Sequence, residues 1–372
     1  MDDSHTLVLD MQKRFLSDWN QRISANNENP DNDFAPMWGA AAELGLTMAI
    51  APDKHGGLGD DGDFHFSYFH QRGALLACAN FGAALAGAWA ILSATNQNDS
   101  ADTLGSGAMR PALPTFPEEI GTFPKKRTLT GQETETGIRL WGQFDIVRAA
   151  PLATHIFAPV RMEDNGDSCI VLLDTDDAAI SIVPFTLVDK ATAGKITITD
   201  LMLKPTHILA RGPLAEAIWV AAQTAMIAAT AAEATGVMQS LLDQTVAYVR
   251  QRQQFGASIG SFQSVQHRLA EMLVEIELTH SLALAASRDL SDTLLASAAK
   301  ARANDALQKM ADCAVQFHGG IGTTEELALS RYFRRAMALR GELGTTEQHF
   351  RLIENAICSE VQPASPVTRS AA

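Results

Sequence analysis

The chain has few cysteines and a deficit of positive charge. Its four cysteines lie far apart and form no CxxC pair or metal-ligand spacing: Cys78, Cys169, Cys313 and Cys358. They predict reduced thiols in a cytoplasmic protein, with no structural disulfide and no metal site. Lysine and arginine number 29 against 43 aspartates and glutamates, which gives a formal net charge of −14. This balance argues against nucleic acid and anionic membranes as partners.

The sequence also offers neither an export signal nor a convincing membrane span. The first residues, MDDSHTLVLDMQKRF, are acidic where a signal peptide needs basic groups, so we expect no export. The longest uncharged stretch, from Ala217 to Ala232, is mostly alanine, contains Gln223 and is followed by Glu233. Its composition predicts a buried helix of a bundle rather than a span.

Hydrophobic periodicity divides the chain into three zones and predicts an α+β fold. Residues 1–110 repeat apolar residues every three or four positions and predict an N-terminal helical domain. Residues 111–210 contain short β-rich runs separated by Gly, Asp and Pro, as in a small antiparallel barrel or sandwich. Residues 211–360 predict a C-terminal four-helix bundle, whose first helix, Leu214 to Arg252, would be about 58 Å long. Residues 361–372 are expected to form a disordered tail.

One motif in the last zone suits a dinucleotide cofactor. It reads YVRQRQQFGASIGSFQSVQHRLAEM and extends from Tyr248 to Met272. Arg252 offers a planar fork of donors that can hold a pyrophosphate, and Phe255 offers a face for adenine or ribose. Gly256 lets the chain turn out of the helix, and Gln263 and Gln266 follow it before the second motif.

A second motif, QFHGGIGTTEE, follows some forty residues later. Gln316 and the pair Gly319 and Gly320 are expected to present exposed backbone amides where a helix begins. Thr323 and Glu326 stand at capping-box spacing for that helix. Because helix N-termini bind anions, the segment predicts a site for a phosphate or a polar ribose edge.

In this order the two motifs resemble the strongest signatures of the flavin-dependent acyl-CoA dehydrogenases. HGGLG at His55 to Gly59 is similar to a loop of the family's first domain, and LWGQFDIV is similar to its middle domain. The order of helices, small β-domain and helical bundle is also that of the family. The resemblance therefore covers nearly the whole chain and implies the same fold.

The resemblance implies a reaction, a cofactor and partners. Family members oxidise an acyl-CoA thioester with FAD: a carboxylate removes the α-proton while hydride leaves the β-carbon for the flavin. An electron-transfer flavoprotein is the implied acceptor. Cofactor contacts, reaching across a dimer interface to the ADP half of a neighbour's FAD, are implied for residues of both motifs: Arg252, Phe255, Gln263, Gln316, Gly319 and Gly320.

The chain departs from the family at the catalytic base. Family members usually carry Glu-Gly-Thr near the C-terminus, with the Glu as base. Matching Gly344 and Thr345 to this Gly-Thr implies a cofactor contact for Thr345 and puts Leu343 at the base position. The alternative base position of a minority of the family falls on Met226. Glu342 stays a candidate base, and a solvated loop carboxylate is the other interpretation of it.

The middle zone departs from the family as well. The flavin-covering Trp-x-Thr is replaced by Ile146 and Arg148, and Thr115 to Gly121 represent only part of another cofactor loop. Contacts within one subunit are thus lost, while those to a neighbour are kept. This pattern resembles the small subunit of heterotetrameric bacterial acyl-CoA dehydrogenases. It predicts an α2β2 complex in which a paralogous subunit shares FAD with this chain at the interface.

Two alternatives stay open: a self-sufficient homo-oligomeric dehydrogenase that uses Glu342, and an inert scaffolding subunit that binds neither FAD nor CoA. Alanine-rich segments at 83–94 and 221–232 favour a bulky acyl group, such as a steroid side chain, although they are also typical of close helix packing. A basic helix face has two interpretations, phosphate contacts or salt bridges with carboxylates: Arg331, Arg334 and Arg335.

Overall fold

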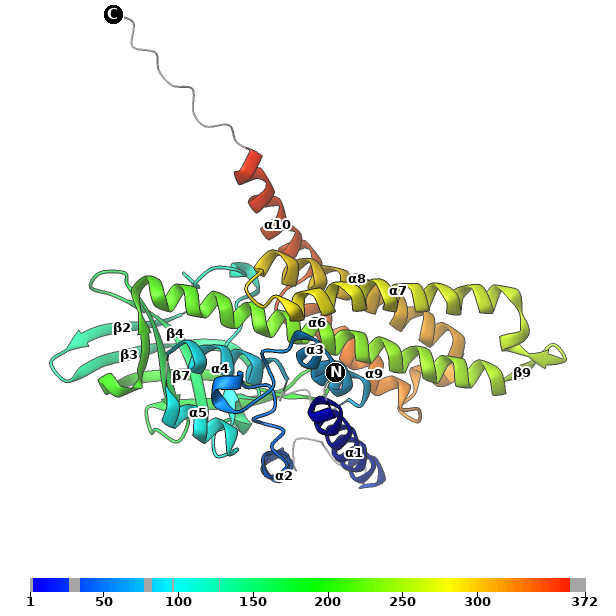
Figure 1. The fold of residues 1–372 in the computed structure, drawn as a ribbon, viewed down its shortest axis with the longest axis horizontal. Helices are drawn as coiled ribbons and strands as arrows, with labels where there is room; N and C mark the ends of the chain where they lie inside the picture. The colour runs from blue at the N-terminus through cyan, green and yellow to red at the C-terminus, as the bar shows by residue number, and fades with distance from the viewer. Residues whose placement is uncertain (1–2, 27–33, 77–81, 96, 127, 362–372) are drawn as a thin grey trace, which may run out of the picture.

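Helix α6 (Gly212–Gln251) runs along most of the long axis of the molecule (Figure 1). The computed structural model describes residues 3–26, 34–76, 82–95, 97–126 and 128–361. α6 is the one helix of these segments that is long and apolar enough to cross a membrane by length and composition alone. Of its most apolar window, 72% is buried inside the protein. This burial is that of a core helix, as its alanine content predicts.

The N-terminal zone is helical, as predicted. Among the described residues it contains α1 (Asp3–Asn26), α2 (Phe34–Glu43), α3 (Gly62–Ala74), α4 (Gly82–Thr95) and α5 (Asn98–Gly105). Asp61 caps α3 by accepting hydrogen bonds from the backbone amides of Asp63 and Phe64. Large aromatic side chains fill the core under α3 and α4: Trp38, Phe64, Tyr68, Phe69 and Trp89.

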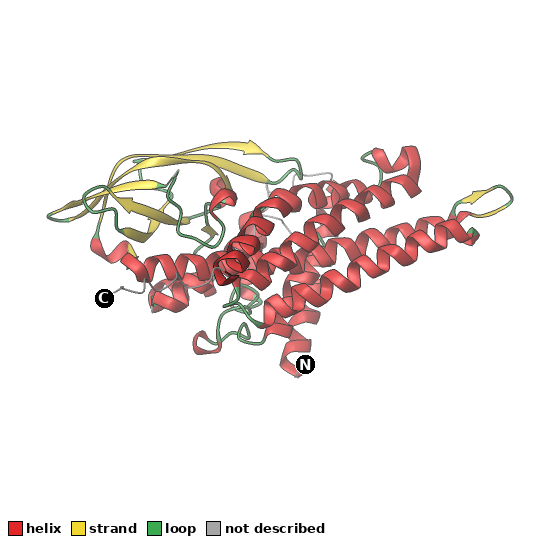
Figure 2. Ribbon diagram, turned by 90° about the horizontal axis from the view of Figure 1, so that it is seen from above, coloured by secondary structure: helices red, strands yellow, loops and turns green. Residues whose placement is uncertain are grey.

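The middle zone forms one eight-stranded sheet. Its strands are β1 (Pro111–Ala112), β2 (Leu129–Thr134), β3 (Gly137–Arg148), β4 (His155–Met162), β5 (Ser168–Asp174), β6 (Ile180–Thr186), β7 (Thr192–Leu203) and β8 (Ile208–Arg211). The strand order is β6-β7-β3-β2-β4-β5-β8. β4 pairs in parallel with β1 and β2. All other pairs of neighbouring strands, including β4 with β5, are antiparallel. The sheet covers one end of the helices (Figure 2).

The C-terminal zone is a bundle around α6. It contains α7 (Gln263–Arg288), α8 (Thr293–His318), α9 (Leu329–Gly341) and α10 (Thr346–Val361), and α10 projects from the body (Figure 1). A short hairpin of β9 (Gln253–Gln254) and β10 (Ala257–Ser258) joins α6 to α7 at the far end from the sheet. The predicted fold class is confirmed by this arrangement. Cys78 and the predicted tail, 362–372, lie outside the described residues.

Two glycines allow α3 and α6 to cross in direct backbone contact. A Cβ atom on Gly236 of α6 would lie 1.9 Å from the carbonyl oxygen of His70, and one on Gly73 of α3 would lie 1.9 Å from that of Glu233. Backbone atoms cannot rotate out of the way as a flexible side chain can. The two helices therefore approach more closely than any other residue at these positions permits.

We expect Gly236→Ala to destabilise the protein by about 1–3 kcal/mol, since the added methyl group forces the two helices apart. The matched control is Gly39→Ala in α2, where nothing lies within 4 Å of the added Cβ. That change should be neutral or stabilise by about 0.5–1 kcal/mol. Urea unfolding of both variants measures the difference. Equal stability of the two would mean that the helices cross farther apart in solution.

Candidate functional site

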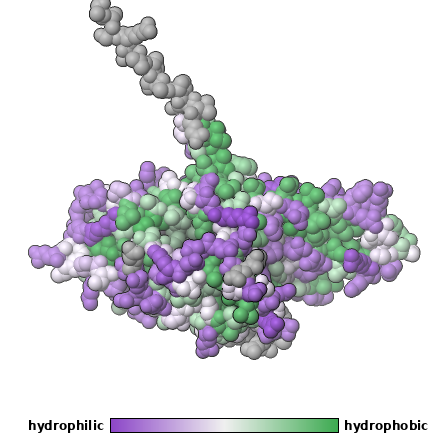
Figure 3. Space-filling view, viewed as in Figure 1, coloured by the Kyte–Doolittle hydropathy of each residue, from purple (hydrophilic) through white to green (hydrophobic). Residues whose placement is uncertain are grey.

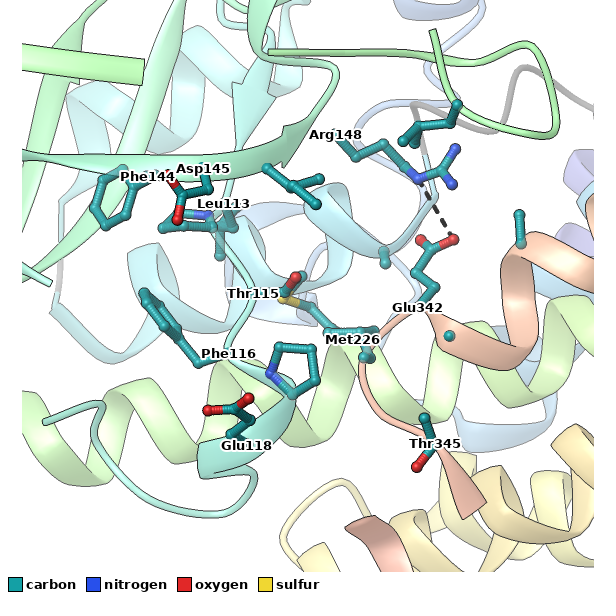
Figure 4. A pocket seen from close by; sticks show the side chains of 18 of the residues that line it. Leu113, Thr115, Phe116, Glu118, Phe144, Asp145, Arg148, Met226, Glu342 and Thr345 are labelled. Atoms are coloured by element: carbon teal, nitrogen blue, oxygen red, sulfur yellow. Dashed lines mark ion pairs between the residues drawn. The ribbon is translucent and has the colours of Figure 1, made fainter. Parts of the chain in front are cut away.

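A cavity of about 660 Å³ lies between the sheet, α4 and α6 and the turn that joins α9 to α10 (Figure 4). The volume is in the range of small-molecule sites. Its wall is mostly apolar and includes Leu113, Phe116, Phe144, Met226, Met337 and Leu343. Segments far apart in the sequence therefore build one pocket at the junction of the β-region and the bundle.

Both positions that the family resemblance assigns to a base lie in this cavity. Met226 comes from α6 and Leu343 from the turn after α9, and both line the pocket. Leu343 has a left-handed backbone, with a φ of 59°, and is buried. Neither a thioether nor an isobutyl group can take a proton from a carbon acid. The cavity therefore has an apolar side chain at each place where a base is expected.

Glu342 belongs to a buried ion-pair network. Its Oε2 lies 2.9 Å from Nη1 of Arg335 and 3.4 Å from Nε of Arg148. Oδ2 of Asp189 lies 3.0 Å from Nη1 of each of these arginines. Oε1 of Glu233 lies 2.7 Å from Nε of Arg335. The network joins β3, the turn between β6 and β7, α6 and α9.

The network makes Glu342 a weak base. Burial by itself raises the pKa of the Glu342 carboxyl, but the guanidinium groups of Arg148 and Arg335 outweigh burial and hold this pKa below its usual value. A base that removes a weakly acidic α-proton works best with a pKa near the working pH. The side chain is only 12% exposed, so the interpretation of Glu342 as a solvated loop carboxylate is wrong.

Lys300 of α8 anchors the turn that carries Glu342 and Leu343. Its Nζ donates hydrogen bonds to the carbonyl oxygen of Leu339 at 2.8 Å and to Oδ1 of Asn304 at 2.5 Å. Asn304 in turn donates to the carbonyl oxygen of Gly344 at 3.1 Å. Complete burial lowers the pKa of Lys300 to about 7. No sequence signal marked this lysine, because it reads as an ordinary polar position of a helix.

The residues of the first motif that are predicted to contact a cofactor lie at the tip of the bundle, far from the cavity. Arg252 follows the last residue of α6 and is exposed, and Phe255 is 91% exposed at the hairpin turn. Phe255 and Gly256 have φ values of 54° and 80°, as a two-residue hairpin of the type I′ class requires. Gln263 is the first residue of α7, whose N-terminus has no side-chain cap.

The second motif lies against the first, as the resemblance implies. The ring of Tyr248 at the end of α6 stacks on that of His318 at the end of α8, with centroids 4.3 Å apart. This contact brings the end of α8, with exposed Gln316, Gly319 and Gly320, beside the last turns of α6. Thr345, in contrast, lines the cavity. The predicted cofactor residues thus fall into two groups, one at the tip of the bundle and one at the cavity.

One prediction about the second motif is wrong. Gly319 and Gly320 do not precede a helix start: Gly319 ends α8 with a φ of 61°, and residues 319–323 form a 3₁₀ turn. α9 begins only at Leu329, so Thr323 and Glu326 do not form a capping box. The reason is that a glycine with positive φ is the usual end of a helix. The exposed helix N-terminus at the tip belongs to α7 instead.

The basic face of α9 serves salt bridges. Arg334 pairs with Glu325 at 2.9 Å, and Arg335 pairs inside the network already described. The partners of Arg335 were missed in the sequence because they come from three different segments. Only its place in a run of arginines marked it.

Comparison with known proteins gives the class of this chain. A family model described as "Acyl-CoA dehydrogenase, C-terminal domain" matches residues 223–358. "Probable acyl-CoA dehydrogenase YngJ" of Bacillus subtilis is 25% identical over 364 residues, which cover 92% of this chain and 93% of that protein. Residues 223–358 thus match the C-terminal domain of the acyl-CoA dehydrogenase family, and the chain is similar to one curated member along nearly its whole length.

Solved structures share the fold across the whole chain. A variant of the "Tcur3481-Tcur3483 steroid ACAD" matches with a TM-score of 0.81 and 24% identity, covering 96% of this chain and 98% of that one. The "ChsE4-ChsE5 complex from Mycobacterium tuberculosis" matches with a TM-score of 0.81 and 20% identity, covering 98% and 99%. The "FAD complex of PigA" matches with a TM-score of 0.84 and 18% identity, covering 97% and 99%. The last of these structures is, by its name, a complex with FAD.

We expect Glu342→Gln to destabilise the protein by about 1–3 kcal/mol at pH 7, because two buried guanidinium groups lose a charged acceptor. The folded-state pKa of Glu342 is depressed. The wild type therefore holds this stabilisation above the unfolded pKa of about 4.3 and loses it as the pH falls through the lower folded pKa. Chemical unfolding across this pH range checks the expectation. Exposed Glu354→Gln on α10 is the control, and a deficit independent of pH would contradict the ion pairing.

Proposed function

We propose that this chain is the subunit of a heteromeric FAD-dependent acyl-CoA dehydrogenase that completes the FAD site of a paralogous catalytic subunit. One observation carries the proposal: the predicted cofactor-contact residues of both motifs are exposed at the tip, while both predicted base positions in the chain's own cavity hold apolar side chains, Met226 and Leu343. Met226 and Arg252 are 26 positions apart on α6, about 39 Å along the helix axis. One dinucleotide cannot reach both ends, so the tip is built for a neighbour's cofactor.

The tip residues fit the ADP half of FAD. Arg252 is exposed and can hold the two phosphate groups with its planar fork. The uncapped N-terminus of α7 at Gln263 adds backbone donors and a positive helix end beside it. Phe255 sits in a left-handed conformation that a bulky residue seldom adopts, and it is held out into solvent. Strain of this kind at an exposed aromatic supports a binding role.

An exposed apolar stripe beside the tip supports subunit association. Leu273, Val274 and Leu278 of α7 are about half exposed. Figure 3 shows hydrophobic side chains over this part of the bundle and along the projecting α10, where Phe350 and Ile357 are also exposed. Contiguous exposed apolar surface of this kind marks protein contacts. The stripe adjoins the tip, so a partner that covers it would bring its own cofactor to Arg252.

In the proposed complex the paralogous subunit supplies the base. Removal of the α-proton needs a carboxylate in a dry site, and neither Met226 nor Leu343 provides one. FAD supplies the acceptor for the hydride that leaves the β-carbon, and an electron-transfer flavoprotein would reoxidise it. The role of this chain is to bind and orient the adenine end of the cofactor. The net charge of −14 and the widely spaced free cysteines support a cytoplasmic complex.

Bulky acyl-CoA thioesters are the proposed substrate class of the complex. Of the solved proteins that share the fold, one is named a "steroid ACAD" and another is named as the "ChsE4-ChsE5 complex". The wide apolar cavity of this chain, next to the alanines of α4, is consistent with a family branch that handles large acyl groups.

The lone chain should be purified nearly without flavin, whereas co-expression with its nearest paralogue should give a yellow complex with one FAD per two chains. In that complex we expect Arg252→Ala to weaken FAD binding about 10- to 100-fold, the equivalent of about 1.5–3 kcal/mol for a charge-assisted contact. Arg250→Ala, one position from the end of the same helix, is the matched control. Flavin absorbance during dialysis measures the loss.

The results also separate the other two interpretations. A lone chain that carries one FAD per chain and turns over substrate would contradict the heteromer. In that protein Glu342→Gln would abolish turnover with FAD still bound. If instead Arg252→Ala leaves FAD binding by the complex unchanged, the chain is a scaffold.

A further inference from the structure

A salt bridge crosses the cavity of this chain from wall to wall. Arg148 stands at the end of β3 on the sheet side, and Glu342 stands in the turn after α9 on the bundle side (Figure 4). Both line the cavity, and Nε of Arg148 lies 3.4 Å from Oε2 of Glu342. At this point the two walls are tied together.

We propose that the Arg148–Glu342 salt bridge excludes a flavin ring from this chain's own cavity, and that Arg148 is the residue that decides this. The inference rests on the proposed function, because it explains why a chain that completes a neighbour's FAD site would not fill its own. In each pair of this chain with its paralogue, the salt bridge would keep the cavity of this chain free of cofactor.

The space at the salt bridge is too narrow for a flat ring. An aromatic ring between two walls needs van der Waals contact on both faces, at about 3.5–4.0 Å each, and so a gap of about 7 Å. The 3.4 Å between Arg148 and Glu342 is half of that. A ring system enters this part of the cavity only when the ion pair separates.

The salt bridge resists separation because each end is held twice. Arg148 also binds Asp189 at 3.0 Å, and Glu342 also binds Arg335 at 2.9 Å. Lys300 fixes the turn behind Glu342. The second partner holds each side chain in place, so moving the two walls apart requires breaking buried ion pairs, which costs more than opening an exposed pair.

The charge balance dictates the variant that tests the proposal. The network holds two guanidinium groups and three carboxylates, so its formal charge is 2 − 3 = −1. Removing Arg148 alone would leave −2 and repel an anionic cofactor. The double variant Arg148→Thr/Glu342→Gln removes one charge of each sign and keeps the balance at −1. It shortens the side chain on the sheet wall and frees the gap.

The first experiment uses lumiflavin, the flavin ring without ribityl chain or phosphates, so that the tip residues and the partner play no part. Lumiflavin fluorescence is titrated with the full-length lone chain. With the wild type we expect no saturable quenching up to the highest concentration tested. With the double variant we expect saturation, with a Kd at least tenfold below that concentration. The matched control is the exposed pair of the same strand region, Arg139→Thr/Asp200→Asn, which should behave like the wild type.

A folded double variant that binds lumiflavin no better than the wild type overturns the proposal. Tight binding of lumiflavin by the wild type overturns it as well. A second variant, Arg148→Gln/Glu342→Gln, keeps a longer polar side chain on the sheet wall than threonine and should show a smaller gain in the same direction. It decides the question if the first variant melts too low to titrate.

The second experiment counts FAD in the co-expressed complex. The double variant should raise the ratio from one FAD per two chains to one per chain, and the control should leave it unchanged. If the proposed function is wrong, the chain will not associate with its paralogue at all. The lumiflavin result does not depend on that association.

Discussion

The buried ion pairs around Arg335 are the contact on which the arrangement of the middle and C-terminal zones depends. Apolar burial drives the zones together but is non-directional, so it does not fix their relative orientation. The guanidinium of Arg335 reaches Glu233 on α6, Asp189 on the sheet and Glu342 behind α9. Because an unpaired buried charge costs several kcal/mol, only the orientation that pairs all of them is available. The cavity takes its shape from this requirement.

Helix α6 (Gly212–Gln251) then sets the distance between the two functional ends. It carries Met226 in the wall of the cavity and leads directly into Arg252 at the tip. Because α3, α7, α8 and α9 all pack on it, the helix cannot bend to bring its ends together. The separation between the cavity, lined by Met226, and the exposed tip at Arg252 is therefore built into one rigid element.

The helical and β zones can be predicted from sequence because periodicity is a local property, and the first bundle helix was expected within two residues of its observed ends. The meeting of Met226 and Leu343 in one cavity follows from family resemblance, since no local pattern relates them. The partners of Glu342 could not be predicted. Arg148 and Asp189 come from the sheet, and no pattern within the sheet reveals how it sits against the bundle.

The crossing of α3 and α6 at Gly73 and Gly236 has a consequence for how such a chain can change over generations. The positions that the resemblance assigns to a base hold leucine and methionine here, and the fold is kept. The two glycines have no such freedom, because any side chain there meets backbone. Drift in this lineage can therefore erase a reaction long before it can erase the scaffold, and a subunit that has lost its own turnover can still serve as a structural partner.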